Sequence, residues 1–167
     1  IAYLSKNYKE MKKKVIAGFN ISCVGDSRTF SYLPSRNNKT LSDEVAKHVL
    51  HWIYPNFKKY SWFDRGSDER QYCSPGIDLP IASILRSKYG EYPEYHTSLD
   101  NLENVVTPKG LEGGYSAIQK ALELIEKNKT YKLKVLGEPH MSKRKLYPTI
   151  STKKINKNIK LMMDFIS

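Results

Sequence analysis

The sequence is poor in cysteine: Cys23 and Cys73 are its two cysteines, and neither belongs to a Cys-x-x-Cys pair. This excludes a zinc ribbon and a disulfide framework, although a single bridge between the two stays open, and a reducing compartment, the cytoplasm, is expected. No apolar run approaches the roughly 20 residues that span a bilayer, so no membrane segment is predicted. The sequence also lacks internal repeats and a glycine-rich phosphate loop, which disfavours a nucleotide-dependent enzyme.

Acidic residues are scarce beside basic ones. The chain has 28 Lys plus Arg against 17 Asp plus Glu, a formal net charge of +11, which raises nucleic acid as a partner. The excess is mostly lysine in scattered clusters, at residues 12–14, 143–145 and 153–154. A groove that follows phosphates usually mixes arginine with aromatic residues, so a nucleic-acid partner is not favoured.

Apolar segments alternate between strand and helix patterns, which predicts the α/β class. Residues 15–24 are apolar and β-branched, as in a buried strand, and Gly25-Asp26 ends them. Thr107-Pro108 is a typical helix start, and the glycine pair 113–114 predicts a close contact of that helix. The predicted elements are strands at 15–24, 60–63 and 79–85, and helices at 42–54 (capped by Ser42) and 107–127, the second covering the sheet with Leu111, Tyr115, Ile118, Leu122 and Ile125.

Three short motifs suggest one site: residues 66–69 (Gly-Ser-Asp-Glu), a Pro-framed turn at 74–80, and residues 95–97 (Tyr-His-Thr) followed by Asp100. His96 lies on a predicted loop, where one ring nitrogen can bind a metal while the other donates to an acceptor such as Asp100. A lone loop histidine is more often a surface residue. His48 and His51 are interpreted as flank residues of an ordinary core helix.

The order of these motifs after Asp26 resembles the zinc aminopeptidase and glutamate carboxypeptidase superfamily, which includes the bacterial leucyl aminopeptidases. Residues 66–75 and 92–98 are most similar to the aminopeptidase-like proteins associated with bacterial surface polysaccharide biosynthesis. The resemblance covers residues 1–150 and implies part of a three-layer α/β/α zinc-peptidase-like sheet with a C-terminal appendage. Residues 151–167 are then a linker and the start of a winged-helix segment, or a docking helix.

The resemblance also implies roles for single residues. Asp26 and His96 match positions that bind two different zinc ions, and Asp100 would support His96. Manganese or cobalt would also suit such a site. From the residues alone, the spacing favours Asp26 as a cap of the following turn. The candidate substrate-binding residues are Asp68, Glu69, Arg70, Arg86 and Tyr95. The alternative for Arg70 and Arg86 is a salt bridge to Asp68, Asp78 or Glu94. A solvated acidic turn is the alternative for Asp68 and Glu69, and packing against the sheet is the alternative for Tyr95.

The superfamily's site needs more ligands than this chain contains. An upstream histidine, a bridging aspartate and the general-base glutamate are expected before Ile1, so the chain is expected to be the C-terminal portion of a longer protein and an incomplete catalyst alone. The predicted function of the whole is hydrolysis of a peptide or amide bond with two metal ions. The alternative is a non-catalytic scaffold that binds a ligand or partner, with an appended winged helix that binds nucleic acid.

Overall fold

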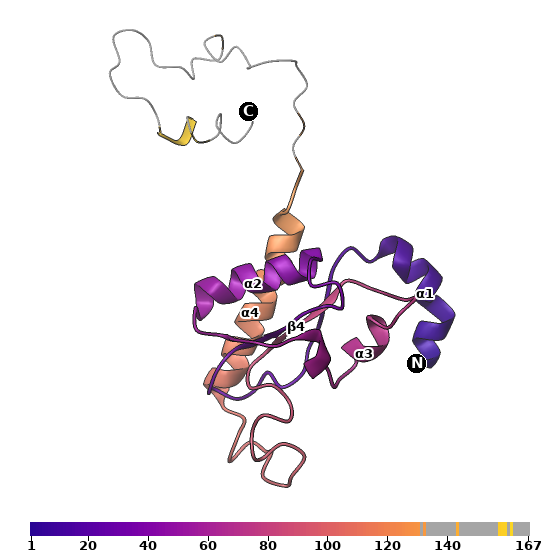
Figure 1. Ribbon diagram of the computed structural model, residues 1–167. Coiled ribbons are helices and arrows are strands. Elements are labelled where there is room, and N and C mark those ends of the chain that lie inside the picture. The colour runs from indigo at the N-terminus through magenta and orange to yellow at the C-terminus, as the bar shows by residue number, and fades with distance from the viewer. Residues whose placement is uncertain (131, 133–142, 144–156, 160, 162–167) are drawn as a thin grey trace. The chain divides into compact units, whose positions relative to one another are not determined.

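The computed structural model describes residues 1–130, 132, 143, 157–159 and 161 (Figure 1). The chain divides into two compact units, Ile1–Asn128 and Lys129–Ser167. In the second unit the described residues 157–159 and 161 are helical. The domain boundary predicted at residue 150 lies outside the described residues and stays a prediction.

The described residues contain four strands, which form one open sheet in the spatial order β1-β4-β2-β3. Strand β1 (Gly18–Asn20) pairs in parallel with β4 (Ile81–Leu85), and β4 pairs antiparallel with β2 (Ser31–Leu33). Strand β3 (Lys58–Lys59) pairs in parallel with β2. The α/β class is therefore confirmed, although the strand predicted at 15–24 is only three residues long.

The two long helices of the sheet begin at threonine caps. Helix α4 (Pro108–Lys127) starts after Thr107, as predicted. Helix α2 (Leu41–Ile53) is capped by Thr40 in a reciprocal pair of bonds with Asp43, and not by Ser42 as predicted. The remaining helices are α1 (Ala2–Lys14), the 3-10 helix η1 (Trp62–Asp64), which replaces the strand predicted at 60–63, and α3 (Glu69–Tyr72).

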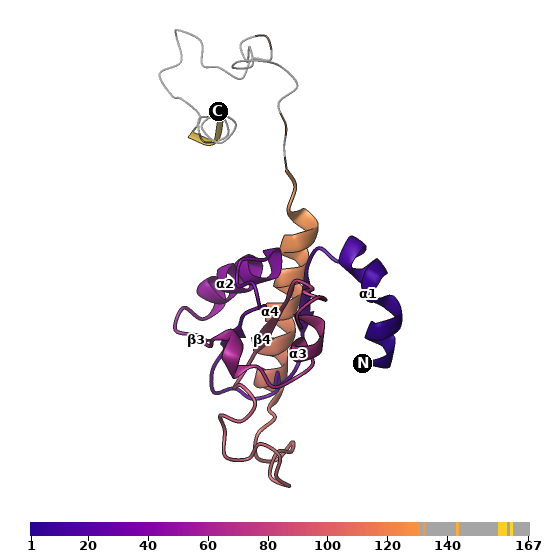
Figure 2. The ribbon, with the colours of Figure 1, turned by 45° about the vertical axis from the view of Figure 1, so that its right-hand side comes forward.

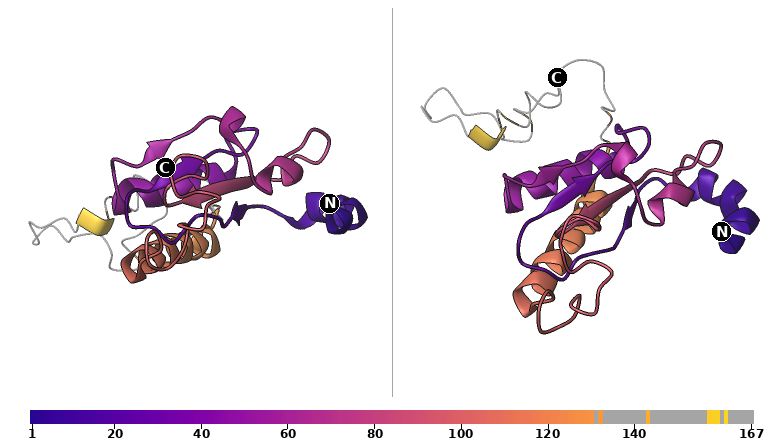
Figure 3. Two further views of the ribbon diagram at one scale, coloured as in Figure 1. Left: turned by 90° about the horizontal axis from the view of Figure 1, so that it is seen from below. Right: turned by 60° about the horizontal axis from the view of Figure 1, so that its bottom comes forward.

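The two faces of the sheet are covered differently. Ala82 and Ile84 point to one face, because side chains alternate along a strand, and they pack in one apolar cluster with α2 and α4. Leu85 points to the other face, where it packs with Leu33, Tyr89 and aromatic residues of the segment around η1. Figures 1 and 2 show α2 and α4 along β4, and α1 lies on the side of α3, apart from them (Figure 3). The three-layer prediction places a second layer of helices on the other face of the sheet. Within the described residues, short helices are all that represents this layer.

Helix α4 packs on the sheet through small residues. A Cβ on Gly114 would stand 2.5 Å from the carbonyl oxygen of Val24, which confirms the close contact predicted at the glycine pair. The buried residues of α4 are Gly110, Gly114, Ala117, Ile118 and Ala121. The prediction that Leu111, Tyr115 and Leu122 cover the sheet was wrong, because these side chains are 47%, 69% and 52% exposed.

Ser83 places a hydroxyl on the second face of the sheet that has no hydrogen-bond partner within the described structure. We expect Ser83→Ala to leave the free energy of unfolding unchanged or to raise it by up to about 1 kcal/mol, because a buried unpaired hydroxyl is costly. Ser42→Ala is the matched control: its hydroxyl accepts from Gly18 N at 2.8 Å and donates to Pro80 O at 2.6 Å, so its loss should cost about 1 to 2 kcal/mol. Urea unfolding of both variants checks this, and equal losses would contradict it.

Both cysteines are free. Cys73 is fully buried, and burial raises the pKa of its thiol. No helix in the described part of the chain is long and apolar enough to cross a bilayer.

Candidate functional site

The segments that carry the predicted metal ligands leave the sheet at one edge. β1 and β4 are adjacent and parallel, so their carboxyl ends lie side by side, and open α/β sheets gather functional groups at such an edge. The chain after β1 runs into Asp26. The chain after β4 enters the loop 86–107, which contains His96 and extends beyond the sheet in Figures 1 and 2.

Both ends of this loop are bonded to the segment that holds Asp26. At one end Arg86 N donates to Cys23 O at 2.8 Å, and at the other Thr107 N donates to Gly25 O at 2.9 Å. Asp26 and His96 therefore lie on two segments that are fastened to each other by backbone hydrogen bonds.

The carboxylate of Asp26 is engaged by the protein. Asp26 is 4% exposed, and its Oδ1 accepts from Arg28 N at 2.9 Å and from Ser87 Oγ at 2.8 Å, while Oδ2 accepts from Ser87 N at 2.7 Å. Three donors fill most of the lone-pair positions of one carboxylate. These bonds tie the turn after β1 to the end of β4, in agreement with the capping alternative, and metal binding by Asp26 stays a prediction.

Arg86 faces the protein. Its Nε donates to Asp26 O at 2.6 Å, its guanidinium carbon lies 3.8 Å from the Phe30 ring centroid, and burial lowers its pKa. The surroundings do not support the predicted grip on a substrate. The substrate contact of Arg86 stays a prediction. Within the described residues neither Arg86 nor Arg70 forms the alternative salt bridge, and Asp78 pairs with Arg36 and Glu94 with Arg28 instead.

His96 is exposed at the surface of the loop. Its ring stacks on Tyr95, with centroids 4.0 Å apart and planes at 17°, and no hydrogen bond of the imidazole occurs within the described residues, so its nitrogens can accept a ligand. His96 has a φ of 58° and Cys23 a φ of 47°. Both residues lie on the segments that are fastened together, but Asn38 and Asp78 also have a positive φ, so this backbone conformation alone does not mark the site.

Asp100 does not contact His96 through any hydrogen bond of the described structure. Its Oδ2 instead accepts from the Tyr92 hydroxyl at 2.9 Å, and that hydroxyl also lies 3.8 Å from Cys23 Sγ. Burial raises the pKa of Tyr92, and the bond to Asp100 adds to this rise. The predicted support of His96 by Asp100 stays a prediction, while Tyr92 joins the loop to the segment after β1.

An ion pair that the sequence did not predict joins the segment after β1 to the loop 86–107. The guanidinium of Arg28 donates two hydrogen bonds to Glu94, both of 2.9 Å, and these bonds lower the pKa of Glu94. The signal in the sequence is position alone, because Arg28 follows Asp26 and Glu94 precedes His96, each by two residues.

Glu69 is enclosed by hydrogen-bond donors and is 0% exposed. It cannot reach a substrate from this position, so its contacts support a structural role and not the predicted substrate contact. Its neighbours Asp68 and Arg70 are exposed. The donors to Glu69 are Gly66 N at 2.8 Å, Ser67 N at 2.9 Å and Tyr89 Oη at 2.7 Å, all to Oε1, and Asn20 Nδ2 at 2.8 Å to Oε2.

The described residues supply part of a zinc site at most. They contain no group of three or more His, Cys, Asp or Glu side chains that could hold a metal ion. A structural zinc takes four ligands and a catalytic zinc three from the protein. An ion bound by His96 would therefore need ligands from outside the described residues.

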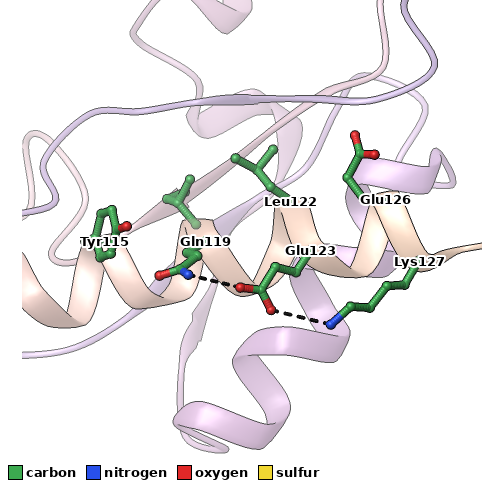
Figure 4. A pocket seen from close by; sticks show the side chains of 7 residues that line it. Tyr115, Gln119, Leu122, Glu123, Glu126 and Lys127 are labelled. Atoms are coloured by element: carbon green, nitrogen blue, oxygen red, sulfur yellow. Dashed lines mark hydrogen bonds and ion pairs between the residues drawn. The ribbon is translucent and has the colours of Figure 1, made fainter.

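A depression of about 410 Å³ lies on the C-terminal half of α4 (Figure 4). Its walls come from one helix, and Figure 4 shows Gln119 bonded to Glu123 and Glu123 paired with Lys127 along the helix surface. The described residues that line it all belong to α4, so no function is assigned to it.

Comparisons with known proteins agree with this architecture. Residues 1–128 match the family model described as "Domain of unknown function (DUF4910)". A Clostridium acetobutylicum protein named "Putative polysaccharide biosynthesis protein with aminopeptidase-like domain" is 36% identical over 151 residues, which cover 90% of this chain and 34% of that protein.

Similar solved structures include two peptidases, one of them named as putative. A crystal structure of a "putative peptidase" from Clostridium acetobutylicum superposes with a TM-score of 0.74 and 34% identity, over 85% of this chain and 33% of that one. An aminopeptidase from Aneurinibacillus sp. strain AM-1 superposes with a TM-score of 0.56 and 14% identity, over 74% of this chain and 29% of that one, which shows the fold alone. The chain thus spans about a third of the length of these relatives, and the resemblance to aminopeptidase-like proteins is confirmed.

Proposed function

Because this chain belongs to the DUF4910 family and shares the fold of peptidase relatives, we propose that it forms the C-terminal portion of a zinc-dependent, aminopeptidase-like hydrolase domain. The observation that carries the proposal is the end of the sheet where two segments, fastened to each other by backbone hydrogen bonds, carry the exposed imidazole of His96 and the buried carboxylate of Asp26. The remaining ligands and the general base would come from residues that precede this chain in a longer protein.

The proposed substrate is a peptide or amide bond. The name of the Clostridium relative includes polysaccharide biosynthesis, and we extend that association to this chain, with an aminoacylated or amidated sugar precursor as the substrate class. Two free cysteines are in keeping with a role in the cytoplasm, because free thiols persist in reducing compartments.

Within this proposal the exposed residues carry the contacts to substrate. Asp68 and Arg70 are exposed. The guanidinium of an arginine such as Arg70 can bind a carboxylate or phosphate through two parallel hydrogen bonds. The buried Glu69 lies between these two residues in the sequence and accepts a hydrogen bond from Tyr89, which belongs to the loop 86–107 of His96. Residues 66–70 and this loop are therefore held to each other. A bound zinc ion would supply Lewis-acid polarisation of the scissile carbonyl.

The test is the zinc content of the longer protein after dialysis, measured by mass spectrometry. We expect His96→Ala to lower it by about one ion per chain, since loss of one of three or four ligands removes most of the affinity for a zinc ion. His51→Ala is the matched control, because His51 is an exposed histidine of α2. Asp26 variants are less informative because they also break three hydrogen bonds. Equal zinc content in all three proteins would refute the ligand assignment.

A non-catalytic scaffold is the second candidate. The observation in its favour is that the carboxylates of Asp26 and Glu69 are both hydrogen-bonded by the protein itself. It predicts that the longer protein releases no amino acid from an aminoacyl anilide even when zinc is supplied. Its appended winged helix would involve residues beyond the described ones, and nucleic-acid binding there stays a prediction.

A further inference from the structure

The loop that contains His96 needs side-chain contacts to hold it in place, because residues 86–107 contain neither helix nor strand. Such a segment orders at a considerable cost in conformational entropy. Its middle part, around His96, has two side-chain links to the segment after β1. One is the Tyr92 hydroxyl near Cys23, and the other is the double hydrogen bond from Arg28 to Glu94.

The second link has the geometry of a strong ion pair. Both hydrogen bonds measure 2.9 Å, and parallel guanidinium-carboxylate bonds are stronger and more directional than a single contact. The guanidinium also lies 5.9 Å from the Tyr92 ring centroid, so the two links lie together. The side chains are 43% and 21% exposed, which limits the strength of the pair by solvent screening.

Arg28 acts at both sides of the junction. Its backbone nitrogen donates to the carboxylate of Asp26, while its side chain holds Glu94 in the His96 loop. A single residue thus connects the buried network of Asp26 and Ser87 to the exposed loop.

We propose that Arg28 and Glu94 are positioning residues: they form a clamp that holds the His96 loop against the segment after β1 and sets the place of the imidazole. The functional part of this inference rests on the proposed function, in which His96 binds a metal. The clamp itself is a statement about the loop and can be tested without any metal.

Cys23 is a native reporter of the clamp. It lies under Tyr92 at the junction and is partly buried, whereas Cys73 is fully buried. When the loop opens, the Cys23 thiol becomes accessible to a thiol reagent such as DTNB. In the metal-free full chain at one fixed pH, we expect Arg28→Gln and Glu94→Gln each to raise the rate of Cys23 modification about fivefold, the factor that a strong exposed pair supplies.

Four controls make the measurement specific. Cys23→Ser should remove the fast phase and so identify the thiol. Arg36→Gln breaks the other exposed arginine-carboxylate pair, with Asp78, and should leave the rate unchanged. The double variant Arg28→Gln with Glu94→Gln should react no faster than either single variant, and the exchanged pair Arg28→Glu with Glu94→Arg should restore much of the slow rate.

Zinc affinity of the longer protein then separates the two proposals. Weakening by about fivefold in Arg28→Gln and Glu94→Gln, with no change in Arg36→Gln, supports the positioning role. Unchanged thiol rates in both clamp variants would overturn the clamp, and raised thiol rates with unaltered zinc affinity would overturn its role in positioning His96. A longer protein that binds no zinc defeats the proposed function, while the thiol rates still judge the clamp.

Discussion

Replacing Gly110 with alanine is expected to lower the free energy of unfolding by about 3 kcal/mol, the upper part of the usual range for overpacking. A Cβ at this position would stand 1.9 Å from Gly25 O and 2.6 Å from both the carbonyl carbon and the carbonyl oxygen of Asp26. These atoms belong to the backbone and cannot turn aside. The first turn of α4 would have to move away from the segment that holds Asp26.

Gly113→Ala is the control on the same helix. Its Cβ would meet Arg86 Nη1 at 3.2 Å and Phe30 Cζ at 3.5 Å, and the end of an arginine side chain can shift by a few tenths of an ångström. Because alanine favours a helix by about 1 kcal/mol over glycine, we expect its stability to be unchanged or slightly raised. Thermal unfolding should show Gly110→Ala about 10 °C below the parent, and equal shifts in the two variants would contradict the close contact.

Periodicity in the sequence located α4 but misjudged its buried side. The large apolar residues repeat at the helical interval and define the helix, yet Tyr115 and Leu122 are exposed. The buried side carries Gly110 and Gly114 because the backbone of residues 24–26 lies against it. A hydrophobic pattern marks the large apolar residues as buried, whereas a close contact with backbone leaves room only for the smallest residues. The two criteria therefore mark different sides of α4 as buried.

The fold class followed from alternating strand and helix patterns, and β4 and α4 were placed well. The short elements were missed for a physical reason: β2 and α3 span three and four residues, too few for a periodic signal. Helix α1 has a single buried residue, Leu4, so it shows little apolar pattern to detect.

The candidate site was predictable only in part. The motifs marked the segments that meet at the edge of the sheet, and β1 and β4 are adjacent and parallel there. The sequence could not show which carboxylates are already hydrogen-bonded by other groups of the protein. Asp26 and Glu69 are both engaged by backbone donors, and a local pattern of residue types gives no count of such donors.

Replacing Glu69 with alanine is expected to cost about 4 kcal/mol, because a buried acceptor is lost and several enclosed donors remain. Two of these donors are the backbone nitrogens of Gly66 and Ser67, and the others belong to Tyr89 and Asn20. Glu69→Gln keeps the size of the side chain but turns an NH₂ group toward these donors, so it should cost about 2 to 3 kcal/mol. Chemical denaturation measures both losses.

The neighbouring carboxylate provides the control. Asp68 is exposed, and Asp68→Asn should change the free energy of unfolding by no more than about 0.5 kcal/mol. Tyr89→Phe removes one donor to Glu69, and its effect should not add to that of Glu69→Gln, because residues in one hydrogen-bond network are coupled. Simple additivity, or a loss at Asp68 as large as at Glu69, would contradict the assignment. If the losses fall as expected, Glu69 joins β1, the Ser67 loop and Tyr89 into one unit, and the exposed Asp68 is positioned by a residue that never meets the solvent.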